Sequence, residues 1–104
     1  PADCSVSFTE HGGSPAMSVP ATGKYLQLAR TALAEEWCRQ AALRASGGSI
    51  PVAGEFQKIL GLDPLLIGYA LADDRIHSPN EKYNLKSFEK GIRSWIRILA
   101  AFAA

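Results

Sequence analysis

The feature that most constrains the fold of this chain is an apolar run at residues 65–70. These residues read Leu-Leu-Ile-Gly-Tyr-Ala, which is typical of a strand that other elements cover on both faces. Helix-like patterns lie on either side of the run. It therefore predicts a parallel strand that crossover helices join to its neighbours. A chain of 104 residues has room for one small domain of this kind.

Further strand and helix patterns alternate along the chain. Residues 4–9 alternate apolar and small polar side chains, and residues 41–45 read as a short second strand. Helical periodicity predicts three helices between and after the strands, at residues 22–39 with Thr22 as N-cap, at 51–60, and from about residue 84. The resulting order predicts the α/β fold class, with mostly parallel strands and crossover helices.

The last predicted helix carries one wide apolar face, which we expect to be its packing face. Its members are Phe88, Ile92, Trp95, Ile96, Leu99 and Phe102. Three strands are few for a parallel sheet, because such a sheet needs cover on both faces and partners at its edges. We therefore expect the missing strands to come from outside this chain, which begins at a proline without an initiator Met.

Charge and hydropathy exclude several classes of partner. Eleven Lys and Arg stand against ten Asp and Glu, scattered along the chain, so we expect neither nucleic acid nor an anionic membrane as a partner. The longest apolar run, residues 64–72, is far shorter than the roughly 20 residues that span a bilayer. Cys4 and Cys38 belong to no C-x-x-C pair, and we interpret them as buried or idle thiols in a reducing cytoplasm.

A first candidate site is the loop of residues 46–49, which leads into a predicted helix. Gly47 and Gly48 allow another molecule to approach the backbone, and the free N–H groups of the helix start favour an anion, with the Ser49 hydroxyl as a further donor. The alternative is that the glycines form a tight turn and that Ser49 caps the helix.

A second candidate is the polar loop after the apolar run, residues 73–81. His77 offers an imidazole to a metal, and Asp73 and Asp74 offer carboxylates, but one histidine does not make a zinc site. The alternative is a surface or capping histidine. His11, which precedes two glycines, either donates a hydrogen bond to a substrate or is a solvated loop histidine.

Two motifs in order resemble a known family. Ser-Gly-Gly-Ser-Ile-Pro-Val at residues 46–52 is followed, 28 residues after Ser49, by His-Ser-Pro-Asn-Glu-Lys at residues 77–82. Together they resemble the carboxyl-terminal part of the carnosinase-like zinc peptidases, which are grouped with acetylornithine deacetylase, succinyl-diaminopimelate desuccinylase and aminoacylase. The resemblance implies a cytoplasmic homodimer with two zinc ions that hydrolyses dipeptides or N-acyl amino acids.

The resemblance also implies a role for each candidate residue. It makes His77 a zinc ligand and lets Asn80 and Glu81 hold the loop and its ring in place. Gly47, Gly48 and Ser49 would hold the terminal carboxylate of the substrate, and His11 would contact the scissile carbonyl. Residues 1–20 would be the end of the lid domain, including its last strand, and residues 21–104 the C-terminal segment of the catalytic domain.

The departures from the family pattern are as informative as the matches. The early His-x-Asp motif, the bridging aspartate and the Glu-Glu pair that supplies the general base have no counterpart in this sequence. We therefore predict that the isolated chain is inactive. The alternative is a non-catalytic interaction module that is derived from the same fold and binds a partner through an uncovered apolar face or sheet edge.

Overall fold

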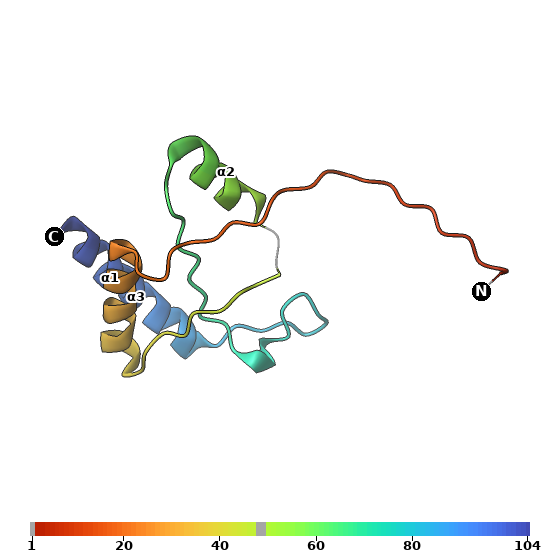
Figure 1. Cartoon of the computed structure of the whole chain (residues 1–104). Helices are drawn as coiled ribbons and strands as arrows, with labels where there is room; N and C mark the ends of the chain where they lie inside the picture. The colour runs from red at the N-terminus through yellow and green to blue at the C-terminus, as the bar shows by residue number, and fades with distance from the viewer. Residues whose placement is uncertain (1, 48–49) are drawn as a thin grey trace. The chain divides into compact units, whose positions relative to one another are not determined.

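The computed structural model describes residues 2–47 and 50–104, and the regular structure in that part of the chain is helical. The elements are α1 (Lys24–Trp37), α2 (Pro51–Leu60), the short 3-10 helix η1 (Ala72–Asp74) and α3 (Leu85–Ala103), as Figure 1 shows. No described residue belongs to a β-strand, so the α/β prediction with parallel strands is wrong for this structure. Two compact units divide the chain, residues 1–18 with 48–64 and residues 19–47 with 65–104.

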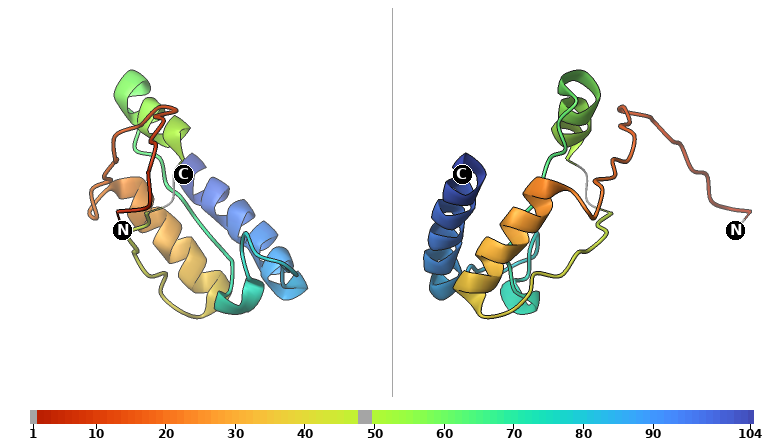
Figure 2. Two further views of the ribbon diagram at one scale, coloured as in Figure 1. Left: turned by 90° about the vertical axis from the view of Figure 1, so that its right-hand side faces the viewer. Right: turned by 60° about the vertical axis from the view of Figure 1, so that its left-hand side comes forward.

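The second unit is built on an antiparallel pair of helices, α1 and α3, which lie side by side in Figure 2. Tyr25 near the start of α1 meets Phe102 near the end of α3, with ring centroids 5.0 Å apart. At the other end of α1, Trp37 lies under the ammonium of Lys90, 4.7 Å from the ring centroid. Aromatic contacts therefore fix both ends of the pair.

Small side chains form the contact between the two helices. The buried apolar core consists of Ala29, Ala32 and Leu33 of α1 with Ile98 of α3. The other buried residues of α3 are Ser87, Gly91 and Ser94. A Cβ at Gly91 would come within 3.2 Å of the Tyr69 ring, so the glycine is what admits that ring to the helix surface.

The large apolar side chains of α3 face outward instead. We call Phe88, Ile92, Trp95, Ile96 and Leu99 the outward row; each of them is 43–63% exposed. The expectation of a packing face is therefore wrong for these five residues, whereas Phe102 does pack against the core. The periodicity is helical as predicted, but α1 packs on the neighbouring, small-residue face of α3.

Residues 65–70 belong to no helix and pair with no neighbouring strand. Leu65, Ile67 and Tyr69 pack against the α1 and α3 core, whereas Leu66 between them is exposed. This alternation is what an extended backbone produces, because successive side chains point to opposite sides. The apolar run is thus explained by packing on helices, and a strand fails to form because the described residues offer no backbone partner to it.

The other two predicted strands also form no backbone pairing with another described segment. Residues 4–9 and 41–45 are neither helical nor paired, and residues 4–9 are exposed along their whole length. Cys4 and Cys38 are free and exposed, so of the two alternatives, buried or idle thiols, burial is wrong. No helix among the described residues has the length and apolar character needed to cross a membrane.

The first unit holds α2, which begins and ends as the sequence predicts. Pro51 occupies its first turn, and Gly61 ends it in the left-handed conformation at φ 64°, where its N–H donates to the Gln57 carbonyl. The Gln57 side-chain amide donates to the Ser18 carbonyl at 2.8 Å and to the Asp63 carboxylate at 3.0 Å. These bonds tie the N-terminal segment to α2 within this unit.

Candidate functional site

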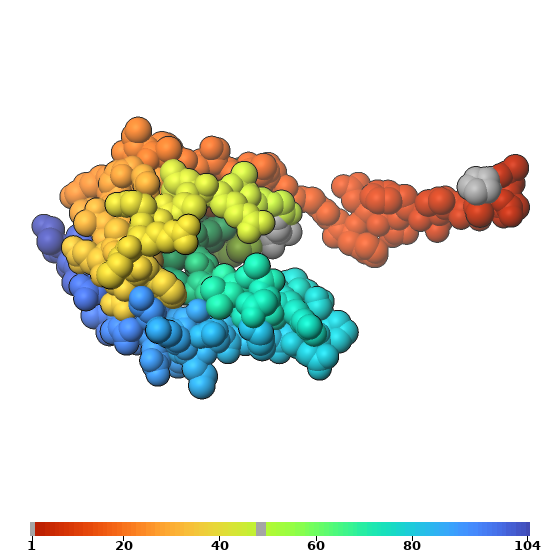
Figure 3. All heavy atoms as spheres, turned by 90° about the horizontal axis from the view of Figure 1, so that it is seen from below, coloured from red at the N-terminus to blue at the C-terminus, as the bar shows by residue number. Residues whose placement is uncertain are grey.

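The candidate site in the second unit is the loop of residues 71–83, which carries His77, Asn80 and Glu81. It begins with η1 and ends before the N-cap of α3, and Figure 3 shows it beside the first residues of that helix. Two turns fold it back on itself. The Ser78 N–H donates to the Arg75 carbonyl at 2.9 Å, and the Glu81 N–H donates to the Ser78 carbonyl at 3.2 Å.

Three residues without the freedom of glycine adopt left-handed backbone conformations in this loop. They are Arg75, His77 and Asn80, with φ of 55°, 60° and 60°. Such conformations cost on the order of 1 kcal/mol each, and they persist where surrounding contacts fix them. We therefore expect specific contacts to hold the loop in this conformation.

One of those contacts is made by Glu81 to His77. The backbone N–H of His77 donates to Oε2 of Glu81 at 3.2 Å. A carboxylate that accepts from the backbone at a left-handed residue stabilises that turn. Glu81 thus contacts the main chain of the residue whose side chain the sequence singles out, and Asn80 lies between them in the same turn.

The root of the loop is organised by a buried carboxylate, that of Asp74, which is 1% exposed. Its Oδ2 accepts from the N–H of Leu71 at 2.7 Å, and its Oδ1 accepts from the Lys82 ammonium at 3.4 Å. The main chain joins the same two residues, because the Lys82 N–H donates to the Asp74 carbonyl at 3.0 Å. These contacts compensate the desolvation of a buried charge.

Lys82 also pairs with Asp73, the exposed neighbour of Asp74, at 2.8 Å. The hydrogen bond from the Lys82 ammonium, with its charge, lowers the pKa of the Asp73 carboxyl. Conversely, the hydrogen bond to Asp73, with a smaller contribution from Asp74, raises the pKa of Lys82. The contact thus favours the ionised carboxylate of Asp73 and the protonated ammonium of Lys82.

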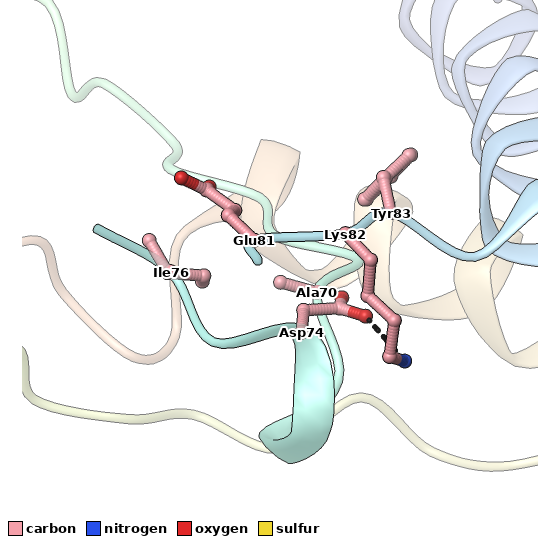
Figure 4. A pocket seen from close by; sticks show the side chains of 6 residues that line it. All are labelled: Ala70, Asp74, Ile76, Glu81, Lys82 and Tyr83. Atoms are coloured by element: carbon pink, nitrogen blue, oxygen red, sulfur yellow. Dashed lines mark hydrogen bonds and ion pairs between the residues drawn. The ribbon is translucent and has the colours of Figure 1, made fainter. Parts of the chain in front are cut away.

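An open hollow of about 470 Å³ lies against this loop. It is lined by Ala70, Asp74, Ile76, Glu81, Lys82 and Tyr83. Figure 4 shows the Lys82 ammonium reaching toward the Asp74 carboxylate, whereas the Glu81 carboxylate points away from that pair. The charged groups that line the hollow are therefore the ion pair of Asp74 with Lys82 and the separate carboxylate of Glu81, which accepts from the His77 N–H.

The donor set for a metal is incomplete in this part of the chain. Among the described residues, no group of three or more His, Cys, Asp or Glu side chains is arranged to hold a metal ion. Asp73 and Asp74, which the sequence offers as carboxylate ligands, are engaged by Lys82. The described residues therefore do not fit a metal centre by themselves, and His77 is the imidazole that they contribute to this loop.

The remaining sequence-predicted residues lie elsewhere. His11 is exposed in the extended segment of the first unit. Gly47 is exposed in the second unit, and apart from its chain neighbours no described atom lies within 4 Å of where its Cβ would be. Gly48 and Ser49 lie outside the described residues. The structure thus brings together His77, Asn80 and Glu81.

Sequence reasoning missed the part that Asp74 and Lys82 play in closing the loop. Adjacent acidic residues followed eight or nine positions later by a lysine were the available signal. The pattern does not say which carboxylate is buried, because a fully buried Asp is rare and depends on its tertiary partners.

Comparison with known proteins adds an independent observation. The family model described as Peptidase family M20/M25/M40 matches residues 3–101. The Cys-Gly metallodipeptidase DUG1 of Candida albicans is 32% identical over 84 residues, which are 81% of this chain and 17% of that protein. The Cys-Gly metallodipeptidase dug1 of Schizosaccharomyces pombe is 47% identical over 47 residues, 45% of this chain and 10% of that protein. No solved structure matches the chain.

Proposed function

The chain belongs to peptidase family M20/M25/M40, and from that premise we propose that it is the C-terminal segment of a dizinc metallopeptidase that hydrolyses dipeptides or N-acyl amino acids. The observation that carries the proposal is the family match over residues 3–101, which includes the whole His77 loop. The two relatives described above are named as Cys-Gly metallodipeptidases, which favours a dipeptide as substrate.

In this proposal His77 supplies one imidazole to a metal centre whose other ligands lie outside this chain. The contact from Glu81 to the His77 backbone and the closure of the loop by Asp74 support the role, because a ligand side chain needs a defined backbone position. The described residues supply neither the further ligands nor a general base in the family context. The isolated 104-residue chain is therefore proposed to be inactive.

Substrate binding is assigned to two further places on the strength of the sequence motifs. Gly47, Gly48 and Ser49 would hold the terminal carboxylate of the substrate through backbone N–H groups and the hydroxyl. His11 would contact the scissile carbonyl. The proposal keeps the domain boundary at residue 20, and it places the complete enzyme in the cytoplasm as a homodimer.

The first test uses the purified chain. We expect no release of free cysteine or glycine from Cys-Gly when the chain is incubated with Zn²⁺ and the products are separated by chromatography. Appreciable hydrolysis that depends on the chain would overturn the proposal that essential groups lie outside it. The same preparation, analysed for zinc after dialysis, is expected to retain none, because one imidazole is a weak site for this metal.

The second test uses a longer protein that carries this segment together with the other ligands. His77→Ala is expected to lower the zinc content and to abolish hydrolysis while the helical circular dichroism is preserved. His11→Ala is the matched control for a histidine outside the metal centre, and it should reduce kcat/KM at full zinc content. Unchanged zinc content in His77→Ala would remove His77 from the metal site.

One observation favours the second candidate, a non-catalytic interaction module. The outward row of α3 is a row of large apolar side chains that are each 43–63% exposed. Sedimentation velocity separates the readings. A stable, well-folded monomer supports an autonomous module, whereas aggregates or exchanged dimers support a segment of a larger domain.

A further inference from the structure

We propose that Asp74 is a positioning residue, which fixes the backbone frame of residues 71–82 and through it the place from which His77 is presented. Its bearing on hydrolysis rests on the proposed function, because it acts through His77. The inference about the frame itself rests on the contacts of this chain alone.

Asp74 joins the two ends of the loop. Its two carboxylate oxygens serve different ends, since Oδ2 accepts from the N–H of Leu71 and Oδ1 from the ammonium of Lys82. An amide presents a single acceptor oxygen and no charge, so it cannot place a separate oxygen on each donor as the carboxylate does. The requirement for a carboxylate at this position is therefore specific.

Burial makes these contacts selective. The Asp74 side chain is 1% exposed, whereas that of Asp73 is 72% exposed, although both pair with Lys82. An exposed ion pair adds little, because water and salt screen it, whereas a buried carboxylate without its donors is unfavourable. The adjacent residue is thus a matched control with the same charge and the same partner.

The frame includes His77. Between the two fixed ends, the turns at Arg75 and Ser78 and the bond from the His77 N–H to Glu81 account for the reversal of the chain. The left-handed conformation of His77, at φ 60°, persists only while the loop is closed around it. Opening the root of the loop is therefore expected to release the backbone at His77.

The experiment measures amide hydrogen exchange by NMR in the 104-residue chain, without added metal, for Asp74→Ala, Asp74→Asn and Asp73→Asn. Asp74→Ala is expected to speed exchange at Leu71, His77 and Lys82 by about tenfold or more, while amides in the middle of α1 and α3 keep their protection. Asp74→Asn is expected to restore protection at Leu71 relative to Asp74→Ala, because its carbonyl oxygen still accepts. Asp73→Asn should leave all three amides within about twofold of wild type.

Wild-type protection of the loop in Asp74→Ala overturns the proposal, and so does an equal effect of Asp73→Asn. If Asp74→Ala loses its helical circular dichroism, the Asn variant decides. In Asp74→Asn, loss of exchange protection at the Lys82 amide with retained protection at the Leu71 amide supports the proposal. Equal loss of protection at both amides overturns it. Because no metal is present, failure of this test leaves the proposed function standing, whereas failure of the His77→Ala test leaves the frame standing.

Discussion

The indole N–H of Trp37 donates a hydrogen bond of 2.9 Å to the hydroxyl of Ser94 across the α1 and α3 pair. Ser94 is fully buried, and its hydroxyl donates a hydrogen bond of 2.8 Å to the Lys90 carbonyl within α3. The Tyr69 ring stacks on the indole, with ring centroids 5.9 Å apart. A buried polar side chain at one end of the interface thus fixes the register of two helices that share few large apolar contacts.

Removing this hydroxyl is expected to destabilise the helix pair. Ser94→Ala leaves the Trp37 N–H without its acceptor, at a cost of about 1–3 kcal/mol. Urea unfolding followed by tryptophan fluorescence measures the change. In a double-mutant cycle with Trp37→Phe, the two effects should be less than additive, and strict additivity would show that the bond contributes nothing.

The core prediction contrasts two adjacent residues of α3. Ile98 is 0% exposed and Leu99 is 62% exposed. Ile98→Ala is therefore expected to lower the free energy of unfolding by about 2–5 kcal/mol, and Leu99→Ala by less than about 0.5 kcal/mol. Thermal or urea unfolding measures both. Similar costs for the two variants would mean that α3 presents a different face to α1.

The N-terminus of α3 offers a capping prediction. Oδ1 of Asn84 accepts from the backbone N–H of Lys86 at 3.0 Å and of Ser87 at 3.3 Å. Asn84→Ala is expected to cost about 1 kcal/mol of unfolding free energy, and Asn84→Asp should retain the cap. Equal stability of the Ala and Asp variants, measured by urea unfolding, would contradict the capping role.

The pH dependence of stability follows from Glu36. Its hydrogen bond with Arg93, reinforced by Arg97, lowers the pKa of the carboxyl. A lowered folded-state pKa gives stability that is fully present above the ordinary value of about 4.5 and is lost as the pH falls through the folded-state value. We expect the unfolding midpoint to fall on acidification below that value.

The check on this prediction is Glu36→Gln, in which that part of the acid sensitivity should disappear. Glu89→Gln on α3 is the matched control, since the described part of the chain shows no ion pair for Glu89. Its acid dependence should follow that of the wild type. An unchanged slope in Glu36→Gln, measured by thermal melts between pH 3 and pH 6, would contradict the assignment.

The helices were accessible to sequence reasoning because their signals are local. Pro51 and Gly61 bound α2 as predicted, and Asn84 caps α3. The start of α1 was off by one position, with Gly23 and not Thr22 at the N-cap. Each of these signals acts within one turn of helix, so neighbouring residues suffice to predict them.

The strands failed because their formation is not local. Residues 65–70 have the composition of a strand, but a ladder needs a second backbone, which no local pattern supplies. The orientation of α3 failed for a related reason. An apolar stripe predicts a packing face only when large side chains do the packing, and here Gly91 and Ser94 admit Tyr69 and Trp37 instead.

The site was predictable in its residue types but not in its conformation. The motif places His77, Asn80 and Glu81 close together in sequence, and the structure keeps them in one loop. The left-handed backbone at His77 and the burial of Asp74 depend on contacts at both ends of the loop, at Leu71 and Lys82, which are distant in the sequence. Neither property can be derived from the motif itself.

The outward row of α3 has a practical consequence for work at the bench. The five exposed apolar side chains of the outward row should bind to hydrophobic chromatography media. Sulfate salts strengthen such binding, because sulfate is excluded from protein surfaces. Retention on a phenyl column should therefore rise steeply with ammonium sulfate. Ile96→Lys should make the chain elute earlier from this column without disturbing the packing of α1 on α3.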